Sequence, residues 1–91
     1  MRSKTTVRFR KAFGALPKHV QDQARKSYRR FKQDPWHQSL RFKQIHQSNP
    51  IYSVRVSKGY RAIGQKTESE IVWFWIGTRG DYEKVVSQLG K

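Results

Sequence analysis

Residues 71–76 of this 91-residue chain read IVWFWI, an unbroken apolar run that holds two of the three tryptophans. A strand that is apolar on both faces is expected in the middle of a sheet, where it is covered on both sides. Two alternating runs precede it, IYSVRV at 51–56 and YRAIGQ at 60–65, with turn residues at 57–59 and a polar stretch at 66–70. Strands joined by short turns predict an antiparallel meander of three strands, with a possible fourth strand at one edge.

Two helices are predicted before this meander. In RFRKAFGAL at 8–16, Phe9, Phe13 and Leu16 recur at the spacing of one helical face. Pro17 can open a second helix that ends near Gln33, just before Asp34-Pro35. The apolar stripe of the second helix consists of Val20, Ala24, Phe31 and either Tyr28 or Ser27.

The remaining segments are less regular. Residues 35–50 read as a connector with a short extended piece at 40–45, which Trp36 and Phe42 are expected to anchor to the core. Segment 81–91 is expected to close the chain with a turn of helix. The fold class is therefore α+β, a single domain over residues 1–91, with the two N-terminal helices on one face of a small twisted sheet. The helical residues of segment 81–91 would be Tyr82, Val85, Val86 and Leu89.

Composition limits the setting in which the chain works. The sequence has no cysteine and no apolar segment of about 18 residues, so a disulfide framework and a membrane span are not expected. The N-terminal stretch MRSKTTVRFRK lacks the apolar core of a secretion signal. We expect a cytoplasmic protein.

The charge of the chain points to a polyanionic partner. Twenty Lys and Arg against six Asp and Glu give a net charge of +14. Such an excess suits nucleic acid, an acidic protein or an anionic membrane surface. The outer face of the second helix is strongly basic, and its Arg29 and Arg30 are candidate RNA-binding residues. Packing of this helix on a sheet is favoured over a membrane surface, because Ala24 and Ser27 weaken its apolar side.

A second cationic group accompanies the predicted strands. Alternation places Arg55 and Arg61 on the same face of neighbouring strands, away from the helices. A guanidinium offers a planar fork of donors to phosphate and stabilises negative charge, but it cannot act as a base at neutral pH. Asp81 is the one carboxylate next to this end of the sheet. The complete candidate set is Arg55, Lys58, Arg61, Arg79 and Tyr82.

Other catalytic signatures are missing from the sequence. It contains no Gly-rich phosphate loop, no HExxH and no GxSxG elbow. His19, His37 and His46 lie too far apart in the sequence to suggest a metal cluster, and surface or capping roles are expected for them. No metal or other cofactor is predicted.

The blocks YSVRVSKGYRAIGQ and IVWFWIGTRGDYEKVV, preceded by two helices, resemble the RelE/ParE superfamily of small bacterial toxins. The resemblance spans residues 8–86. It implies a basic sheet face that binds mRNA on the ribosome and cleaves it without a metal, by driving the ribose 2′-hydroxyl onto the adjacent phosphate. It also implies a cognate antitoxin. Arg61, Arg79 and Tyr82 would be catalytic, while Arg55 and Lys58 would bind RNA.

Three features depart from the superfamily pattern. Arg79 stands where many relatives have His, so it cannot carry out a proton transfer assigned to that His. Ser53 stands near a position where RelE itself has Lys, and the N-terminal strand of many members is expected to be short or missing. Two alternatives therefore stay open: a ParE-like inhibitor of DNA gyrase that is not an enzyme, and a degenerate member that only binds RNA or a partner.

Overall fold

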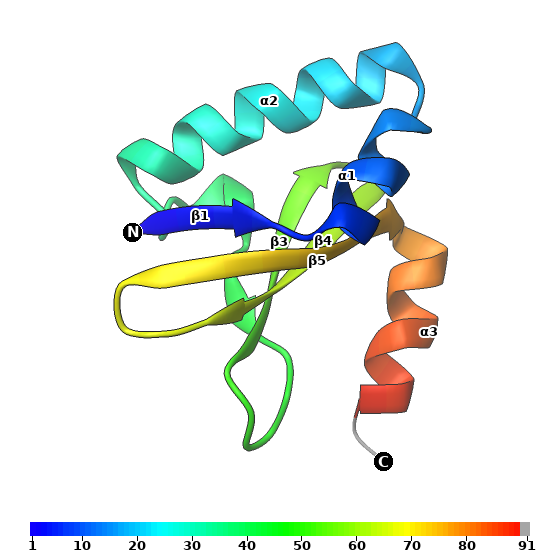
Figure 1. Cartoon of the computed structure of the whole chain (residues 1–91). Helices are drawn as coiled ribbons and strands as arrows, with labels where there is room; N and C mark the ends of the chain where they lie inside the picture. The colour runs from blue at the N-terminus through cyan, green and yellow to red at the C-terminus, as the bar shows by residue number, and fades with distance from the viewer. Residues whose placement is uncertain (90–91) are drawn as a thin grey trace.

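The computed structural model describes residues 1–89, and Figure 1 shows its elements. Gly90 and Lys91, the end of the predicted segment 81–91, lie outside the described residues. The elements follow in the order β1 (Arg2–Thr5), α1 (Val7–Gly14), α2 (Lys18–Gln33), the 3-10 helix η1 (Gln38–Leu40), β2 (Lys43–Gln44), β3 (Ile51–Ser57), β4 (Tyr60–Lys66), β5 (Glu70–Thr78) and α3 (Arg79–Leu89).

Within residues 1–89 the sheet has five strands in the order β1-β5-β4-β3-β2. The predicted meander β3-β4-β5 is confirmed, and β2 lies in the predicted extended piece at 40–45. The prediction of a three-stranded, wholly antiparallel sheet was wrong, because two edge strands extend the meander and one of them, β1, pairs with β5 in parallel. The sequence RSKT shows no apolar alternation, and β1 is held by its backbone pairing and by a Lys4–Glu70 ion pair at 3.5 Å. With β1 on its other side, β5 is an interior strand, as its apolar run predicts.

The two N-terminal helices form where they were predicted. Thr6 caps α1, with its Oγ1 accepting the Phe9 N–H, a cap that supplies a partner for an otherwise unpaired amide. α2 buries Val20 and Phe31, and Ser27 rather than Tyr28 faces the sheet. The Ser27 hydroxyl donates to the Val56 carbonyl at 2.8 Å, which fixes α2 against β3.

Aromatic rings fill the core between the helices and the sheet. Phe31 lies edge-on to both Phe42 and Trp73, with ring centroids 5.1 and 5.5 Å apart. Phe42 is buried and anchors the connector as expected. Trp36 packs on Phe42 with ring centroids 4.9 Å apart, but from the outside, so that 60% of it is exposed. Its backbone N–H donates to the Asp34 carboxylate in a local turn.

The side chains of β5 divide between the two faces of the sheet. Trp73 packs toward α1 and α2, whereas Trp75 lies on the opposite face against Tyr82, with ring centroids 6.5 Å apart. An irregularity in the β4–β5 register lies between Ile63 and Gly64. α1 and α2 cover one face as predicted, and α3 lies on the other side of the sheet, against β4 and β5 (Figure 1).

A search for membrane-spanning helices among residues 1–89 finds none that is both long and apolar enough.

The close packing of Trp73 predicts that Gly64 does not tolerate a side chain. A Cβ at Gly64 would lie 2.8 Å from Trp73 Cε3 and 2.9 Å from Ile71 Cγ1, and both of these residues are buried. We expect Gly64→Ala to lower the free energy of unfolding by about 1–3 kcal/mol, the usual cost of overpacking. Urea denaturation followed by tryptophan fluorescence measures it.

Gly59→Ala is the matched control, because no heavy atom of the described residues lies within 4 Å of a Cβ there. It should unfold at the urea concentration of the unchanged protein. Equal stability of the two variants would contradict the described packing of β4 on β5.

Candidate phosphate-binding site

The face of the sheet opposite α1 and α2 carries a small cavity of about 200 Å³. Of the predicted site residues, Arg55, Arg61, Arg79 and Tyr82 line it together. Lys58, Arg29 and Arg30 are not among its lining residues. We call this site the cationic cavity; its other lining residues are Arg41, Lys43, Ser53 and Glu83.

Arg55 and Arg61 are directly opposite each other in the β3–β4 pair. Like charges at opposed positions of an antiparallel pair destabilise a sheet. Both side chains are half-buried, so water only partly screens their repulsion. An anion between them would remove this cost, and the pair is therefore better suited to binding phosphate than to stabilising the fold.

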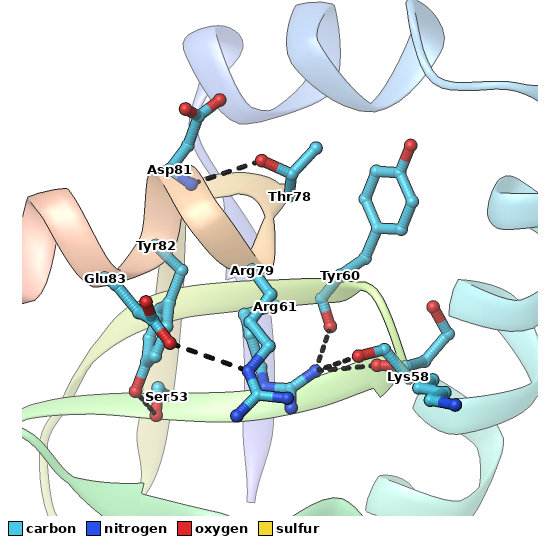
Figure 2. A network of polar contacts seen from close by, with 10 residues as sticks. Ser53, Lys58, Tyr60, Arg61, Thr78, Arg79, Asp81, Tyr82 and Glu83 are labelled. Atoms are coloured by element: carbon cyan, nitrogen blue, oxygen red, sulfur yellow. Dashed lines mark hydrogen bonds and ion pairs between the residues drawn. The ribbon is translucent and has the colours of Figure 1, made fainter.

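Arg61 is held in place by the turn between β3 and β4. Its Nη1 donates to the carbonyl oxygens of Ser57 at 2.7 Å, Tyr60 at 2.9 Å and Lys58 at 3.3 Å (Figure 2). In the described part of the chain, Nε and Nη2 make no hydrogen bond to the protein, so these donors remain for a ligand. Lys58 thus contributes its carbonyl to the site.

The surroundings of Arg61 lower the pKa of its guanidinium. Burial is the largest cause that lowers the pKa of its guanidinium, followed by the neighbouring charges of Arg79, Arg55 and Arg41. The group stays protonated at neutral pH, as arginine does in proteins. The folded protein therefore pays an electrostatic cost here that a bound anion relieves.

Arg79 begins α3 at the mouth of the cavity. Its backbone N–H donates to the Gly59 carbonyl at 2.8 Å, which ties the start of the helix to the β3–β4 turn. Its Nε lies 3.6 Å from Glu83 Oε1, and the two side chains point toward each other (Figure 2). They are 61% and 67% exposed, and such surface ion pairs contribute little. Arg79 can therefore exchange Glu83 for a phosphate at small cost.

Tyr82 reaches the cavity from the first turn of α3. Its hydroxyl lies 2.9 Å from Ser53 Oγ, and either oxygen can be the donor. Ser53 is only 2% exposed, and the Tyr82 ring rests against Trp75. These contacts fix the position of the phenol. Ser53, which departs from the superfamily pattern, is here the partner that orients Tyr82.

Arg41 and Lys43 line the cavity but were missed in the sequence. They flank Phe42, whose ring is buried in the core on the other face. The alternation Arg-Phe-Lys in an extended piece could have revealed them, because neighbours of a core residue point the opposite way. Arg41 also has a left-handed backbone, with φ 48°, which is uncommon for residues other than glycine.

Asp81 is not placed to serve the cavity. Its N–H donates to Thr78 Oγ1 at the start of α3, and its carboxylate points away from Arg61 and Arg79 (Figure 2). The sequence had identified Asp81 as the one carboxylate next to this end of the sheet. Glu83 takes this position instead, because a spacing of four residues places it on the same helix face as Arg79.

The remaining predicted polar residues lie elsewhere. Arg29 and Arg30 are exposed on α2, where Arg30 Nη1 donates to Ser39 Oγ at 3.0 Å. His37 caps η1, where its Nδ1 accepts the Ser39 N–H, which confirms a capping role for it, and His46 Nδ1 accepts backbone N–H bonds within the loop before β3. Residues 1–89 hold no group of three or more His, Asp or Glu side chains placed to bind a metal.

A larger groove, of about 540 Å³, lies on the helix side of the sheet. Its lining is mainly apolar, and the buried Ser3 hydroxyl within it has no hydrogen-bond partner in residues 1–89. We call it the apolar groove. Its apolar lining residues include Phe9, Phe13, Ala24, Phe31, Val56 and Trp73, and its exposed lining residues include Lys4, Arg10, Arg25 and Tyr28.

The fold and the cationic cavity together define a small α+β protein with a cationic sheet face, and known proteins share this fold. RelE from the archaeal RelE-RelB complex of Pyrococcus horikoshii OT3 superposes with a TM-score of 0.69 at 19% identity, over 87% of this chain and 94% of that one. YafQ from E. coli BL21(DE3) superposes with a TM-score of 0.70 at 12% identity, over 90% of this chain and 98% of YafQ. Isolated E. coli RelE superposes with a TM-score of 0.60 at 17% identity, over 96% of both chains.

The sequence itself assigns the family. The ParE-like toxin domain profile matches residues 18–84. The chain therefore belongs to the ParE-like toxin family, within the RelE/ParE superfamily that its sequence resembles. A search of curated protein sequences finds no match.

Proposed function

We propose that this toxin binds RNA in the cationic cavity and cleaves it by attack of a ribose 2′-hydroxyl on the adjacent phosphate. The observation that carries the proposal is the juxtaposition of Arg55 and Arg61 in register at the base of the cavity. This pair costs stability unless an anion occupies it. A phosphodiester that gains negative charge in its transition state fits such a site better than a neutral ligand.

The cationic residues of the cavity and its Tyr82–Ser53 pair each have a proposed task. The free donors of Arg61 and the guanidinium of Arg79 stabilise the charge on the phosphate as it becomes five-coordinate. Arg55, with Arg41 and Lys43, holds the neighbouring backbone phosphates. The Tyr82 hydroxyl, oriented by Ser53, donates a proton to the departing 5′-oxygen. These side chains supply the proposed chemistry without a metal or another cofactor.

The basic face of α2 serves a different part of the substrate. Arg29 and Arg30 are exposed on the helix that covers the other face of the sheet, so they cannot contact the phosphate held in the cavity. We assign them to ribosomal RNA beside the cleavage site. This role would place the protein on translating ribosomes in the cytoplasm, and the exposed side chain of Lys58 extends the contact at the cavity edge.

The family profile also favours a second candidate. The name ParE-like toxin domain fits an inhibitor of DNA gyrase that acts by protein contact and not by catalysis. Such a protein has no need for four guanidinium groups around one cavity. A member that only binds RNA would retain the cavity but release no product. The three candidates predict different effects of induction in the cell. The nuclease produces new RNA ends, the gyrase inhibitor blocks replication, and the member that only binds RNA does neither.

The apolar groove supports an antitoxin as protein partner. RelE of Pyrococcus horikoshii was solved in complex with RelB. Here the groove joins an apolar floor to exposed cations, which suits a segment that is both apolar and acidic. We assign the groove to an acidic, amphipathic antitoxin segment, which matches the net charge of +14.

Arg61→Ala tests the proposed activity. We expect it to relieve growth arrest on induction and to slow RNA cleavage at least about 100-fold, the usual effect of removing a donor to transition-state charge. Mapping of RNA 5′ ends after induction measures cleavage. Arg8→Ala removes the same charge from an exposed helix position outside the cavity and should cleave like the unchanged protein. Unaltered cleavage by a folded Arg61→Ala protein, or blocked replication without new RNA ends, would refute the proposed site.

Tyr28→Ala tests the assignment of the groove. Tyr28 is 42% exposed on α2 and lines the groove, so its loss should weaken binding of an antitoxin by about tenfold or more. A candidate antitoxin that neutralises the unchanged toxin should then fail to neutralise this variant, which stays toxic. Trp36→Ala, another exposed aromatic but outside the groove, is the control. Full neutralisation of Tyr28→Ala, with unchanged affinity for the antitoxin, would show that the antitoxin binds another surface.

A further inference from the structure

The cationic cavity lacks an obvious proton acceptor. Attack by a 2′-hydroxyl requires a base, and a guanidinium or an ammonium group has no lone pair to offer. The Tyr82 hydroxyl is engaged with Ser53 and serves as a donor in the proposed reaction. Asp81 points away from the cavity (Figure 2). Proton transfer therefore needs a group that the sequence did not identify.

We propose that Glu83 is this group, and that its carboxylate takes the proton from the attacking 2′-hydroxyl. The inference rests on the proposed RNA cleavage. Among the described residues that line the cavity, Glu83 carries the only carboxylate. It stands among Arg41, Lys43, Arg55, Arg61 and Arg79.

The position of Glu83 follows from the helix that carries it. α3 begins at Arg79, and residues four apart share a face, so Glu83 lies one turn further along the same side. In Figure 2 its carboxylate faces the guanidinium of Arg79. The carboxylate is 67% exposed and has no buried partner that would fix it in its present position. It can therefore turn toward a bound ribose.

Substrate binding would free the carboxylate for this role. A phosphate that enters the cavity competes with Glu83 for Arg79, and their contact at 3.6 Å is a weak surface pair. Once Arg79 binds the phosphate, Glu83 loses its cationic partner. The exchange leaves an acceptor next to the same phosphate whose neighbouring 2′-hydroxyl must be deprotonated.

The proposed step balances in atoms and charge. The 2′-hydroxyl proton moves to a Glu83 carboxylate oxygen while the 2′-oxygen forms a bond to phosphorus. The bond from phosphorus to the 5′-oxygen breaks, and the Tyr82 hydroxyl gives that oxygen its proton. Solvent then carries the proton from Glu83 back to Tyr82. The products are a 2′,3′-cyclic phosphate and a 5′-hydroxyl, with no net gain or loss of protons by the protein.

This role also accounts for Arg79 at a position where many relatives have His. A guanidinium stabilises phosphate charge but cannot transfer a proton at neutral pH. With Glu83 one helical turn away, the two tasks of a histidine are divided between two side chains. Arg79 would provide the positive charge and Glu83 the proton acceptor.

Glu83→Gln removes the proton acceptor and its negative charge and keeps the shape of the side chain. The purified protein is assayed on a short synthetic RNA, free and as the message of a programmed ribosome. We expect Glu83→Gln to cleave about 100-fold or more slowly, the scale of a general base. Glu83→Asp should recover part of the lost rate. Affinity for the same RNA with a 2′-deoxy ribose at the cleavage position should be unchanged or tighter, because a competing carboxylate is gone.

Asp81→Asn is the matched control, since it removes the same charge two residues away and outside the cavity. It should cleave like the unchanged protein.

Two results would overturn the inference and leave RNA cleavage standing. One is a Glu83→Gln cleavage rate within about threefold of that of the unchanged protein. The other is an equal loss of cleavage rate in Asp81→Asn, which would show that only the net charge matters. Failure of the unchanged protein to cleave either form of the RNA would instead remove the proposed function, and the role of Glu83 with it.

Discussion

Arg55 and Arg61 face each other across the β3–β4 pair, and this repulsion is tolerated because the strands that carry them are fixed from behind. Val54 and Ala62, their neighbours on the helix side, are buried with Phe31 and Trp73 in the core. Burial of a large apolar side chain stabilises the fold by about 1.5–3 kcal/mol. This is more than the destabilisation that a screened pair of like charges causes. The core thus stabilises a charge arrangement that would otherwise push the strands apart.

The cavity brings together three segments that are distant in sequence. Residues 41–43 enter from the edge strand, residues 53–61 from the meander, and residues 79–83 from the start of α3. One backbone hydrogen bond, from the Arg79 N–H to the Gly59 carbonyl, joins the third segment to the second. Arg61 is tied to the same turn through Nη1. The donors are therefore placed before any ligand arrives, which reduces the ordering that binding requires.

The meander and the faces of its strands could be predicted because alternation and turn residues are local signals. Arg55, Arg61, Arg79 and Tyr82 accordingly come together as expected. β1 was expected to be short or missing, because RSKT is polar throughout; it forms a strand of four residues through backbone pairing with β5 and a Lys4–Glu70 ion pair. Trp36 was expected to anchor the connector; its ring packs on Phe42, but a local turn at Asp34 leaves it 60% exposed. Glu83 was missed because its place in the cavity depends on where α3 begins, and the sequence predicted only a turn of helix over 81–91.

If the cationic cavity cleaves RNA through its own side chains, the chemistry of the new RNA ends reveals it. The ends are analysed after incubation of the purified protein with free RNA in EDTA and with ribosome-bound message in a buffer that contains Mg²⁺. We expect 5′-hydroxyl and 2′,3′-cyclic phosphate ends, because the ribose oxygen is the nucleophile and no metal-bound water takes part. Ends with a 5′-phosphate on either substrate, or cleavage of free RNA that stops in EDTA and returns with added Mg²⁺, would show that the cavity does not act in this way.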